Sequence, residues 1–386
     1  MTNRKELDRE FFKGKRPWSK IKDEVLGKYL KPYLAKVKML KKEILLIDTF
    51  AGPGKFDDGE SGSPLMMVQM ARKMVNDNYK AIFVNNDRVH HESILHLFGE
   101  KCPLGNLIEN QIVIPIYDDA KKFLIRLNSS LTDQTVFLYL DPYALEGCEF
   151  NTWLPFLKRE QKASTEILVN INISAIRRLA SRKSFSKGKI NNEIIRHHKR
   201  LDEVIGGKYW REFLLGSSLS QKDAEEELMK KFKKRILKYV KYVGYCPVKE
   251  KPKNLAKFYI MFLSNSEDGL MLMNDIMCKA YDTRMKKSIT KPIPLFPDME
   301  IKWKNEENTM ELRNIILTFI TSEPNKSRKE YWLLICIDYF MQYIEREYRA
   351  AVKDLHHDNK LLFKNVKGTK RLNDHSILYL PDHKSI

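Results

Sequence analysis

The chain has 386 residues, 43% of them hydrophobic, and carries 69 lysines and arginines against 50 aspartates and glutamates. This length suits two domains with a sizeable core, and a net charge of +19 favours a polyanionic partner, most often nucleic acid. The five cysteines are far apart and form no Cys-x-x-Cys pair, which excludes a disulfide framework and a cysteine zinc site. No stretch has the length and apolarity of a membrane span, and the charged start lacks a secretory leader, so we predict a cytoplasmic protein.

The first predicted element is an amphipathic helix over 18–39, in which Ile21, Val25 and Tyr29 recur at helical spacing. Short apolar strands then alternate with helices. The strands are predicted at 43–50, 80–87, 111–120, 134–143 and 165–174, and the helices at 63–77, 92–102, 120–130 and 151–161. Strands that are apolar on both faces and separated by helices predict a parallel sheet covered by helices, an α/β fold.

Residues 176–240 are predicted to form a basic helical insertion, with nine basic residues and one acid between 177 and 200. Two further strands at 239–249 and 256–266, a helix at 269–285 and a proline-rich linker at 290–300 follow. We therefore expect an N-terminal helical segment (1–40), a Rossmann-like domain (41–290) and a C-terminal domain (301–386).

The C-terminal domain is predicted to hold three helices and a basic hairpin, the layout of a winged helix. Arg346, Arg349 and Lys353 are spaced to share one face of the third helix, with Lys367 and Lys370 on the wing. The alternative is a helical cap that packs on the main domain through residues such as Trp332.

Polar residues follow each of the first four strands, where open parallel sheets bind ligands. The stretch Asp48-Thr49-Phe50-Ala51-Gly52-Pro53-Gly54 follows the first strand, and its glycines allow a tight turn and close approach of a ligand. Asn85 and Asp87 follow the second strand, where a polar side chain can hold a ribose. Asp118 follows the third strand and Asp141-Pro142-Tyr143 the fourth.

The Asp141-Pro142-Tyr143 stretch resembles the Asp/Asn/Ser-Pro-Pro-aromatic site of enzymes that methylate the exocyclic amine of adenine or cytosine. A carboxylate and a backbone carbonyl can accept the hydrogens of such an amine, and an aromatic ring can stack an extruded base. This chain has one proline where that pattern has two.

Four stretches, "IDTFAGPG", Gly-Ser-Pro at 62–64 (with Ser63 and Pro64), "DPYALEG" and "FYIMFLSNSEDGLMLMNDIMCKA", together resemble the three-Cys-motif partner family of methyltransferase-like proteins. The chain is more distantly similar to the adenine-N6 methyltransferase of large-subunit ribosomal RNA. The resemblance implies S-adenosylmethionine as cofactor and a seven-stranded sheet with one antiparallel strand. It also implies cofactor contacts from Lys22, Asp48, Phe50, Ala51, Gly52, Gly54, Ser63, Asn85, Asp87 and Asp118, and acceptor contacts from Asp141, Pro142 and Tyr143.

Two functions remain open. The chain is either a methyltransferase acting on a nucleic-acid base, with an adenine amine as the expected acceptor, or a non-catalytic nucleic-acid-binding protein that partners a three-Cys-motif protein. Basic residues expected to contact nucleic acid are Arg177, Arg178, Arg182 and Lys183, besides those of the C-terminal domain. Adjacent histidines such as His90 and His91 point apart on a helix, so no metal site is predicted.

Overall fold

The computed structural model describes residues 17–381 with nine short gaps, at 104, 144, 160–163, 181–184, 187–188, 191, 251–253, 289–296 and 366–370. The chain divides into two compact units, Met1–Ser266 and Glu267–Ile386. We had expected the boundary in the linker at 290–300, after the helix that ends the Rossmann-like domain. That helix instead belongs to the C-terminal unit.

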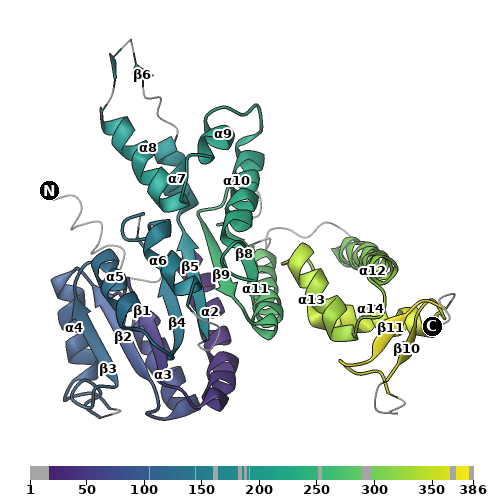
Figure 1. Cartoon of the computed structure of the whole chain (residues 1–386), viewed down its shortest axis with the longest axis horizontal. Coiled ribbons are helices and arrows are strands. Elements are labelled where there is room, and N and C mark those ends of the chain that lie inside the picture. Colours follow the sequence, from purple (N-terminus) through teal and green to yellow (C-terminus); the bar gives the residue numbers. More distant parts are fainter. Residues whose placement is uncertain are drawn as a thin grey trace. The chain divides into compact units, whose positions relative to one another are not determined.

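The N-terminal unit is built on one sheet with helices on both faces (Figure 1). Its sheet strands are β1 (Ile44–Asp48), β2 (Lys80–Asn85), β3 (Val113–Tyr117), β4 (Thr135–Leu140), β5 (Thr165–Ile171), β8 (Tyr242–Val248) and β9 (Phe258–Ser264). Its helices are α2 (Pro17–Val37), η1 (Lys38–Leu40), α3 (Ser63–Val75), α4 (Arg88–Phe98), α5 (Ala120–Ser130), α6 (Phe150–Leu157), α7 (Ile173–Ala180), α8 (Asn192–Ile205), α9 (Trp210–Leu214) and α10 (Gln221–Ile236). A small hairpin, β6 (Phe185–Ser186) with β7 (Lys189–Ile190), lies between α7 and α8.

The sheet has the strand order β3-β2-β1-β4-β5-β9-β8. The pairs among β1 to β5 are all parallel, and β9 runs antiparallel to both β5 and β8. Seven strands with one reversed strand next to the last are the sheet of a Rossmann-like methyltransferase. The α/β fold class that we predicted is therefore confirmed.

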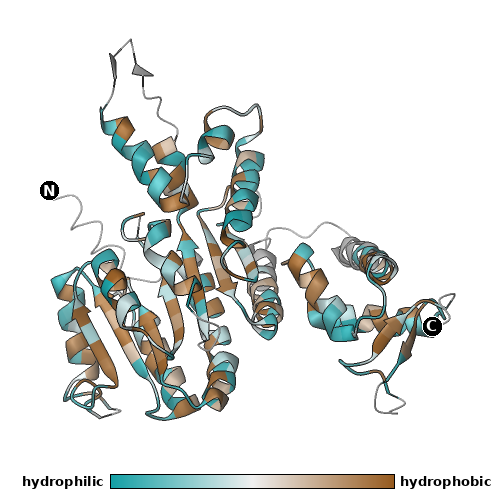
Figure 2. Cartoon of the chain, in the orientation of Figure 1, coloured by the Kyte–Doolittle hydropathy of each residue, from teal (hydrophilic) through white to brown (hydrophobic). Residues whose placement is uncertain are grey.

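The apolar content of the strands explains their place in the sheet. Every residue of β1, β4 and β5 is buried, and Figure 2 shows the hydrophobic strands between helices whose outer faces are hydrophilic. Both edge strands contain a proline, Pro115 in β3 and Pro247 in β8. Proline has no N–H to offer to a further strand, so it suits an edge and blocks extension of the sheet.

Helix α2 packs on the sheet and is part of this unit. The ring of Tyr29 lies 6.1 Å from that of Phe137 in β4 and 4.9 Å from that of Phe262 in β9. The Tyr29 hydroxyl also donates a 2.7 Å hydrogen bond to Glu166 at the start of β5. These contacts position the face of α2 that carries Lys22, which is buried.

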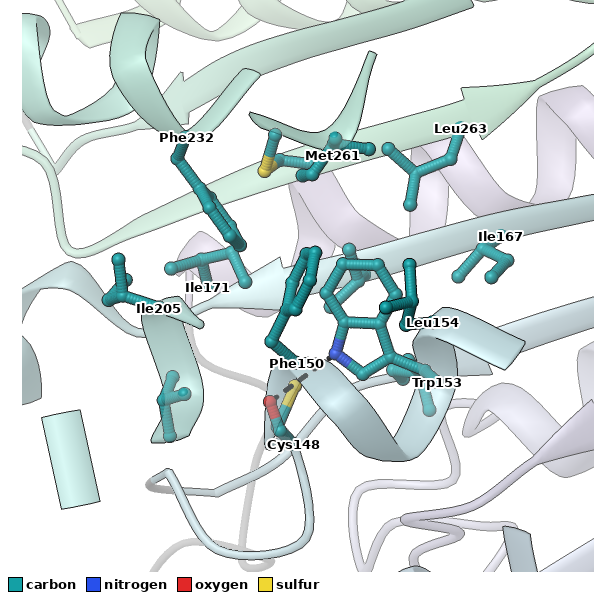
Figure 3. Close-up of a cluster of buried hydrophobic side chains, with 14 of the residues drawn as sticks. Cys148, Phe150, Trp153, Leu154, Ile167, Ile171, Ile205, Phe232, Met261 and Leu263 are labelled. Carbon is teal, nitrogen blue, oxygen red and sulfur yellow. Dashed lines mark hydrogen bonds between the residues drawn. The ribbon is translucent and has the colours of Figure 1, made fainter. Parts of the chain in front are cut away.

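The opposite face of the sheet carries the large core cluster shown in Figure 3. Phe150 and Trp153 of α6 pack edge to face at 5.0 Å, and Phe232 of α10 lies 6.0 Å from Phe150. The Trp153 indole donates to the carbonyl of Cys148 at 3.4 Å. This cluster thus anchors the end of the loop that follows β4, and it includes helices of the predicted insertion.

The C-terminal unit contains α11 (Glu267–Ser288), α12 (Pro297–Ser322), α13 (Arg328–Asp338), α14 (Glu345–His357), β10 (Leu362–Lys364) and β11 (Ile377–Tyr379). Strands β10 and β11 form an antiparallel hairpin, and Ser327, ahead of α13, bridges to Ile377 of β11. Tyr348, Val352 and Leu355 of α14 are buried inside this unit. Trp332 stacks on Tyr348 within the unit at 5.2 Å.

Helix α11 holds the start of α14. The Asp275 carboxylate accepts from the backbone N–H of Glu345 at 2.9 Å, and Asn274 donates to the Tyr343 carbonyl at 2.8 Å. Among the helices that the structure describes, none is both long enough and apolar enough to cross a membrane.

Candidate functional site

A cavity of about 340 Å³ lies at the carboxyl ends of β1 to β4. Because these strands are parallel and adjacent, the polar residues that follow them meet at one edge of the sheet. All the residues we predicted for the cofactor and the acceptor line the cavity, except Asp48. The lining residues among them are Lys22, Phe50, Ala51, Gly52, Gly54, Ser63, Asn85, Asp87, Asp118, Asp141, Pro142 and Tyr143.

Asp48 has a different place from the one we expected. It is fully buried beneath the turn, where its carboxylate accepts from the Phe50 N–H at 3.0 Å and from the Ser63 hydroxyl at 2.6 Å. Burial raises the pKa of Asp48 to about 7. Asp48 therefore holds the turn 49–54 against the start of α3 and does not line the cavity.

The two glycines of the turn have different reasons to be glycine. Gly54 has a φ of +83°, and a Cβ there would lie 2.6 Å from Cδ2 of Leu97. Its carbonyl accepts from the Gly62 N–H at 2.8 Å, which closes the loop back onto α3. Gly52 lines the cavity and has no positive φ, so its small size leaves room for a ligand and does not relieve backbone strain.

The residues after β2 and β3 are partly engaged with their own backbone. Asp87 caps α4 by accepting from the N–H groups of Val89 and His90 at 2.8 and 3.1 Å. Asn85 accepts from the Asp87 N–H at 2.9 Å, while its buried Nδ2 has no hydrogen-bond partner among the described residues. A buried amide without a partner is unfavourable, so the Asn85 Nδ2 indicates a missing acceptor.

Asp118 is hydrogen-bonded at both carboxylate oxygens. One oxygen accepts from the Asp119 N–H at 2.7 Å, and the other pairs with Arg126. The hydrogen bond from Arg126 lowers the pKa of Asp118. Asp118 is thus an anion at neutral pH on the β3 side of the cavity.

The other end of the cavity is organised around Asp141. Lys22 Nζ donates to both oxygens of this carboxylate at 2.7 and 2.6 Å, and the Tyr139 hydroxyl lies 3.1 Å from one of them. Asn170 in turn donates to the Tyr139 hydroxyl at 3.2 Å. The network fixes Asp141 as a carboxylate acceptor next to Pro142 and Tyr143, and the Tyr143 side chain is 60% exposed.

The charge of the lining contrasts with that of the chain. Its ionisable residues are Lys22, His90 and the acids Asp23, Asp87, Asp118, Asp119, Asp141 and Glu146. With one lysine against six acids, the cavity suits a ligand that carries positive charge. This composition disfavours a nucleoside triphosphate or another polyanion inside it.

Sequence reasoning missed Phe258, whose ring lies 4.9 Å from Lys22 Nζ in a cation–π contact. Phe258 is the first residue of β9. Because this strand is reversed, the amino end of β9 lies at the edge where the parallel strands end. At a reversed strand the residue at its start, and not the residue after its end, reaches the ligand edge, so the direction of β9 is the signal that indicates Phe258. Glu146 and Gly147, in the loop after β4, also line the cavity.

Arg177 is not available to nucleic acid as we had predicted. Its guanidinium donates to Glu225 of α10 at 2.5 Å and to the Ala256 carbonyl at 3.0 Å, and the Glu225 side chain is only 2% exposed. An arginine in such a pair compensates a buried carboxylate and cannot leave it at low cost. Arg177 is therefore a structural residue.

The other predicted nucleic-acid contacts fall into three groups. Arg178, Arg346 and Lys353 are exposed. Arg349 is exposed too, but it pairs with Glu345 of its own helix and with Asp374. Arg182, Lys183, Lys367 and Lys370 lie outside the described residues.

No family model and no curated protein matches the sequence. Among solved structures, the chain is similar to a Legionella pneumophila protein labelled DUF519, with 10% identity, a TM-score of 0.34, and coverage of 63% of this chain and 84% of that one. It is also similar to a spermidine synthase, with 9% identity, a TM-score of 0.31, and coverage of 69% and 68%. The plantazolicin methyltransferase BpumL, solved with SAH, has 11% identity, a TM-score of 0.27, and coverage of 64% and 85%.

These likenesses are too distant to say what the chain binds or does. The strand order and directions of the sheet, together with the polar residues gathered at its carboxyl edge, assign the N-terminal unit to the Rossmann-like methyltransferase fold.

Proposed function

We propose that the protein is an S-adenosylmethionine-dependent methyltransferase that acts on a nucleic-acid base, with an adenine exocyclic amine as the acceptor. The observation that carries the proposal is the acidic cavity at the carboxyl edge of a methyltransferase sheet, with Asp141-Pro142-Tyr143 at one end. A cavity of about 340 Å³ falls within the range of roughly 300 to 1,000 Å³ that small-molecule sites occupy.

The residues present fit this cofactor. The turn at Gly52 would face its methionine part, Asn85 would offer its unpartnered Nδ2 to the ribose, and Asp118 would lie on the adenine side. The sulfonium and the ammonium of S-adenosylmethionine are cations, which the acidic lining suits. When bound, the cofactor would supply an electrophilic methyl group.

Asp141 and Tyr143 would receive the acceptor base. An exocyclic amine is a weak nucleophile because its lone pair is delocalised into the ring. The Asp141 carboxylate could accept an amine hydrogen, and the exposed Tyr143 ring could stack the base. Lys22 would hold the Asp141 side chain in place, since it donates to both carboxylate oxygens.

The distribution of charge over the sheet supports a polyanionic acceptor. Residues 51–150, which contain β2, β3 and β4, carry 9 basic and 14 acidic residues. Residues 151–266, which contain β5, β9 and β8, carry 26 basic and 11 acidic residues, a net charge of +15. The segment that contains β5, β9 and β8 is thus the basic one, which favours a nucleic-acid substrate.

Titration calorimetry with S-adenosylmethionine tests the cofactor, and Gly52→Leu is the variant that should block it. Gly52 does not have a positive φ, so leucine can adopt its backbone conformation. Loss of cofactor binding in a folded variant would therefore place the ligand at the turn. Transfer of a labelled methyl group to RNA and DNA tests the reaction. We expect Asp141→Ala to abolish transfer while cofactor affinity changes less than about threefold, and equal transfer by Asp141→Ala would refute the acceptor assignment.

A second candidate function is a non-catalytic nucleic-acid-binding protein that partners a three-Cys-motif protein. Lys22 occupies both oxygens of Asp141, and the second proline of the amino-methyltransferase pattern is absent, so the acceptor end could be a remnant. Cofactor binding without transfer to any RNA or DNA, alone or with the partner added, would favour this function.

The C-terminal unit is proposed to be a winged helix, because a hairpin follows three helices and Ser327 adds a bridge to its second strand. Its charge predicts a minor part in binding. This unit carries 20 basic and 18 acidic residues, whereas the N-terminal unit carries 49 and 32. Nearly all the excess positive charge thus belongs to the unit with the cavity.

A further inference from the structure

The densest run of basic residues among the described elements lies at the end of α10 and in the turn after it. Residues 230–241 contain seven lysines and arginines, and no acid occurs from 228 to 249. By comparison, α8 and α14 each carry three basic and three acidic residues. The lysine-rich end of α10 was not among the contacts that the sequence led us to expect.

Three of these lysines form a row. Lys231, Lys234 and Lys238 are exposed and recur at intervals of three and four residues, so they share one side of the helical path. That path continues past the end of α10, because Leu237 has helical dihedrals and its N–H bonds to the Lys233 carbonyl at 3.0 Å. Lys241, after this turn, is also exposed.

Two other basic residues of the segment already have partners. Lys230 pairs with Glu227 at 2.7 Å, and the guanidinium of Arg235 lies 5.2 Å from the Phe150 ring. Lys231, Lys234 and Lys238 form no ion pair with any residue in the described ranges. Like charges three and four residues apart on a helix repel one another, so the row is unfavourable until an anion neutralises it.

We infer that the row formed by Lys231, Lys234 and Lys238 binds the phosphodiester backbone of a nucleic acid. The three residues span about 10 Å along the helical path, a length over which one strand of a duplex carries about three phosphates. The inference does not depend on methyl transfer, because a binding protein and an enzyme would both use this surface.

Two other anionic partners fit less well. A helix that binds a membrane surface inserts an apolar face into the lipid. The apolar side of α10 instead packs in the protein core, where Leu228, Phe232 and Ile236 are fully buried. An acidic protein would need a matching row of carboxylates, whereas a nucleic acid has regularly spaced charge along its whole length.

The test compares two double variants of the full chain, each losing two positive charges. Lys234→Gln with Lys238→Gln removes two members of the row. Lys31→Gln with Lys73→Gln removes two exposed lysines from α2 and α3 and serves as the control. Glutamine keeps helix propensity and adds no acid at the end of α10. Thermal melting confirms that both variants are folded.

Fluorescence anisotropy with a labelled single-stranded RNA, its DNA counterpart and a duplex measures Kd from 50 to 300 mM salt. We expect the row variant to bind about tenfold more weakly and its log–log salt slope to fall by about 1.4 on single strands and about 1.8 on a duplex. The control should shift the slope by less than about 0.5. Equal effects of the two variants, or no salt-dependent binding by the unmodified chain, would overturn the inference.

Two further arms separate the alternatives. Displacement of the probe by polyglutamate at the same charge concentration would also overturn the inference. So would binding to phosphatidylserine vesicles that is as tight as binding to nucleic acid and that the row variant loses. Calorimetry with S-adenosylmethionine on the same proteins should give equal affinities for both variants. Failure of the unmodified chain to bind this cofactor would count against the proposed function and leave the row untouched.

Discussion

Glu166 offers a quantitative test of how α2 is held on the sheet. Its side chain lies at the start of β5, only 4% exposed, and accepts from the Tyr29 hydroxyl at 2.7 Å and from the Ser264 hydroxyl at 3.0 Å. Burial raises the pKa of Glu166 from 4.5 to about 7. The change to test is Glu166→Gln, which keeps a hydrogen-bonding side chain of the same size but removes the ionisation.

The sign of the effect follows from the raised pKa. Between about pH 4.5 and pH 7 the folded protein holds a proton at Glu166 that the unfolded chain has released, so stability falls as the pH rises through this window. The difference of about 2.5 in pKa corresponds to an upper limit of about 3 kcal/mol. As the pH rises from 4.5 to 8, the free energy of unfolding of Glu166→Gln should therefore increase by up to about 3 kcal/mol relative to that of the unmodified protein.

Urea unfolding of both proteins at several pH values in this window measures the difference. Asp48, whose pKa is also raised to about 7 by burial, contributes the same slope to both proteins and cancels. Glu43→Gln is the control, because Glu43 is 40% exposed and pairs with Lys80 at the surface, and it should change the pH dependence by less than about 0.5 kcal/mol. Parallel stability curves for Glu166→Gln and the unmodified protein would refute the reasoning.

Three further predictions concern residues whose roles the structure defines. Gly54→Ala should lower the free energy of unfolding by about 1 to 3 kcal/mol. Gly59→Ala should lower it less, because Gly59 has the same φ of +83° but nothing lies within 4 Å of the added Cβ. Equal losses in urea unfolding would show that contact with Leu97 does not matter. Arg177→Met should lower the free energy of unfolding by about 3 kcal/mol, because it leaves the buried Glu225 without its partner. Arg178→Met should lower it by about 0.5 kcal/mol or less. Thermal melting that ranks the two variants otherwise would show that Arg177 does not compensate Glu225. Arg346→Gln with Lys353→Gln should weaken RNA binding less than about threefold, since the C-terminal unit is nearly neutral; a tenfold loss would make α14 a main contact.

The position of the cavity could be predicted from the sequence because it depends on two short-range patterns. Continuous apolar runs predict buried parallel strands, and a polar residue at the end of each run predicts a common ligand edge. These patterns placed Gly52, Asn85, Asp118 and Asp141 around one cavity. The direction in which each side chain turns is a tertiary property, so Asp48, which turns under its own loop, could not be separated from the others.

The distribution of charge was predicted less well, because it depends on partners far apart in the chain. Arg177 pairs with Glu225, which lies 48 residues away, and counting charges within a window cannot detect such a pair. The row at Lys231, Lys234 and Lys238 appeared in the sequence as an ordinary lysine-rich helix end. The burial of Phe232 and Ile236 and the pairing of Lys230 show which lysines of this segment are exposed without an ion pair.

Under the proposed function, the opposite charges of the two halves of the sheet would match the two ligands. A cationic methyl donor is attracted by acids, and a nucleic-acid strand is repelled by those same acids, so one surface would bind both less well than two surfaces of opposite charge. Residues 51–150 are net acidic and residues 151–266 net basic, and β4, at whose end Asp141 lies, is the strand next to the basic half. Lys22 and Asp141 place one charge of each sign at this junction, 2.6 Å apart. A base that entered there would leave its phosphates over the basic half while its amine reached the acidic cavity. Replacing Lys22 by methionine should therefore impair acceptance of the base more than binding of the cofactor, and an equal loss of both would place Lys22 in the cofactor site alone.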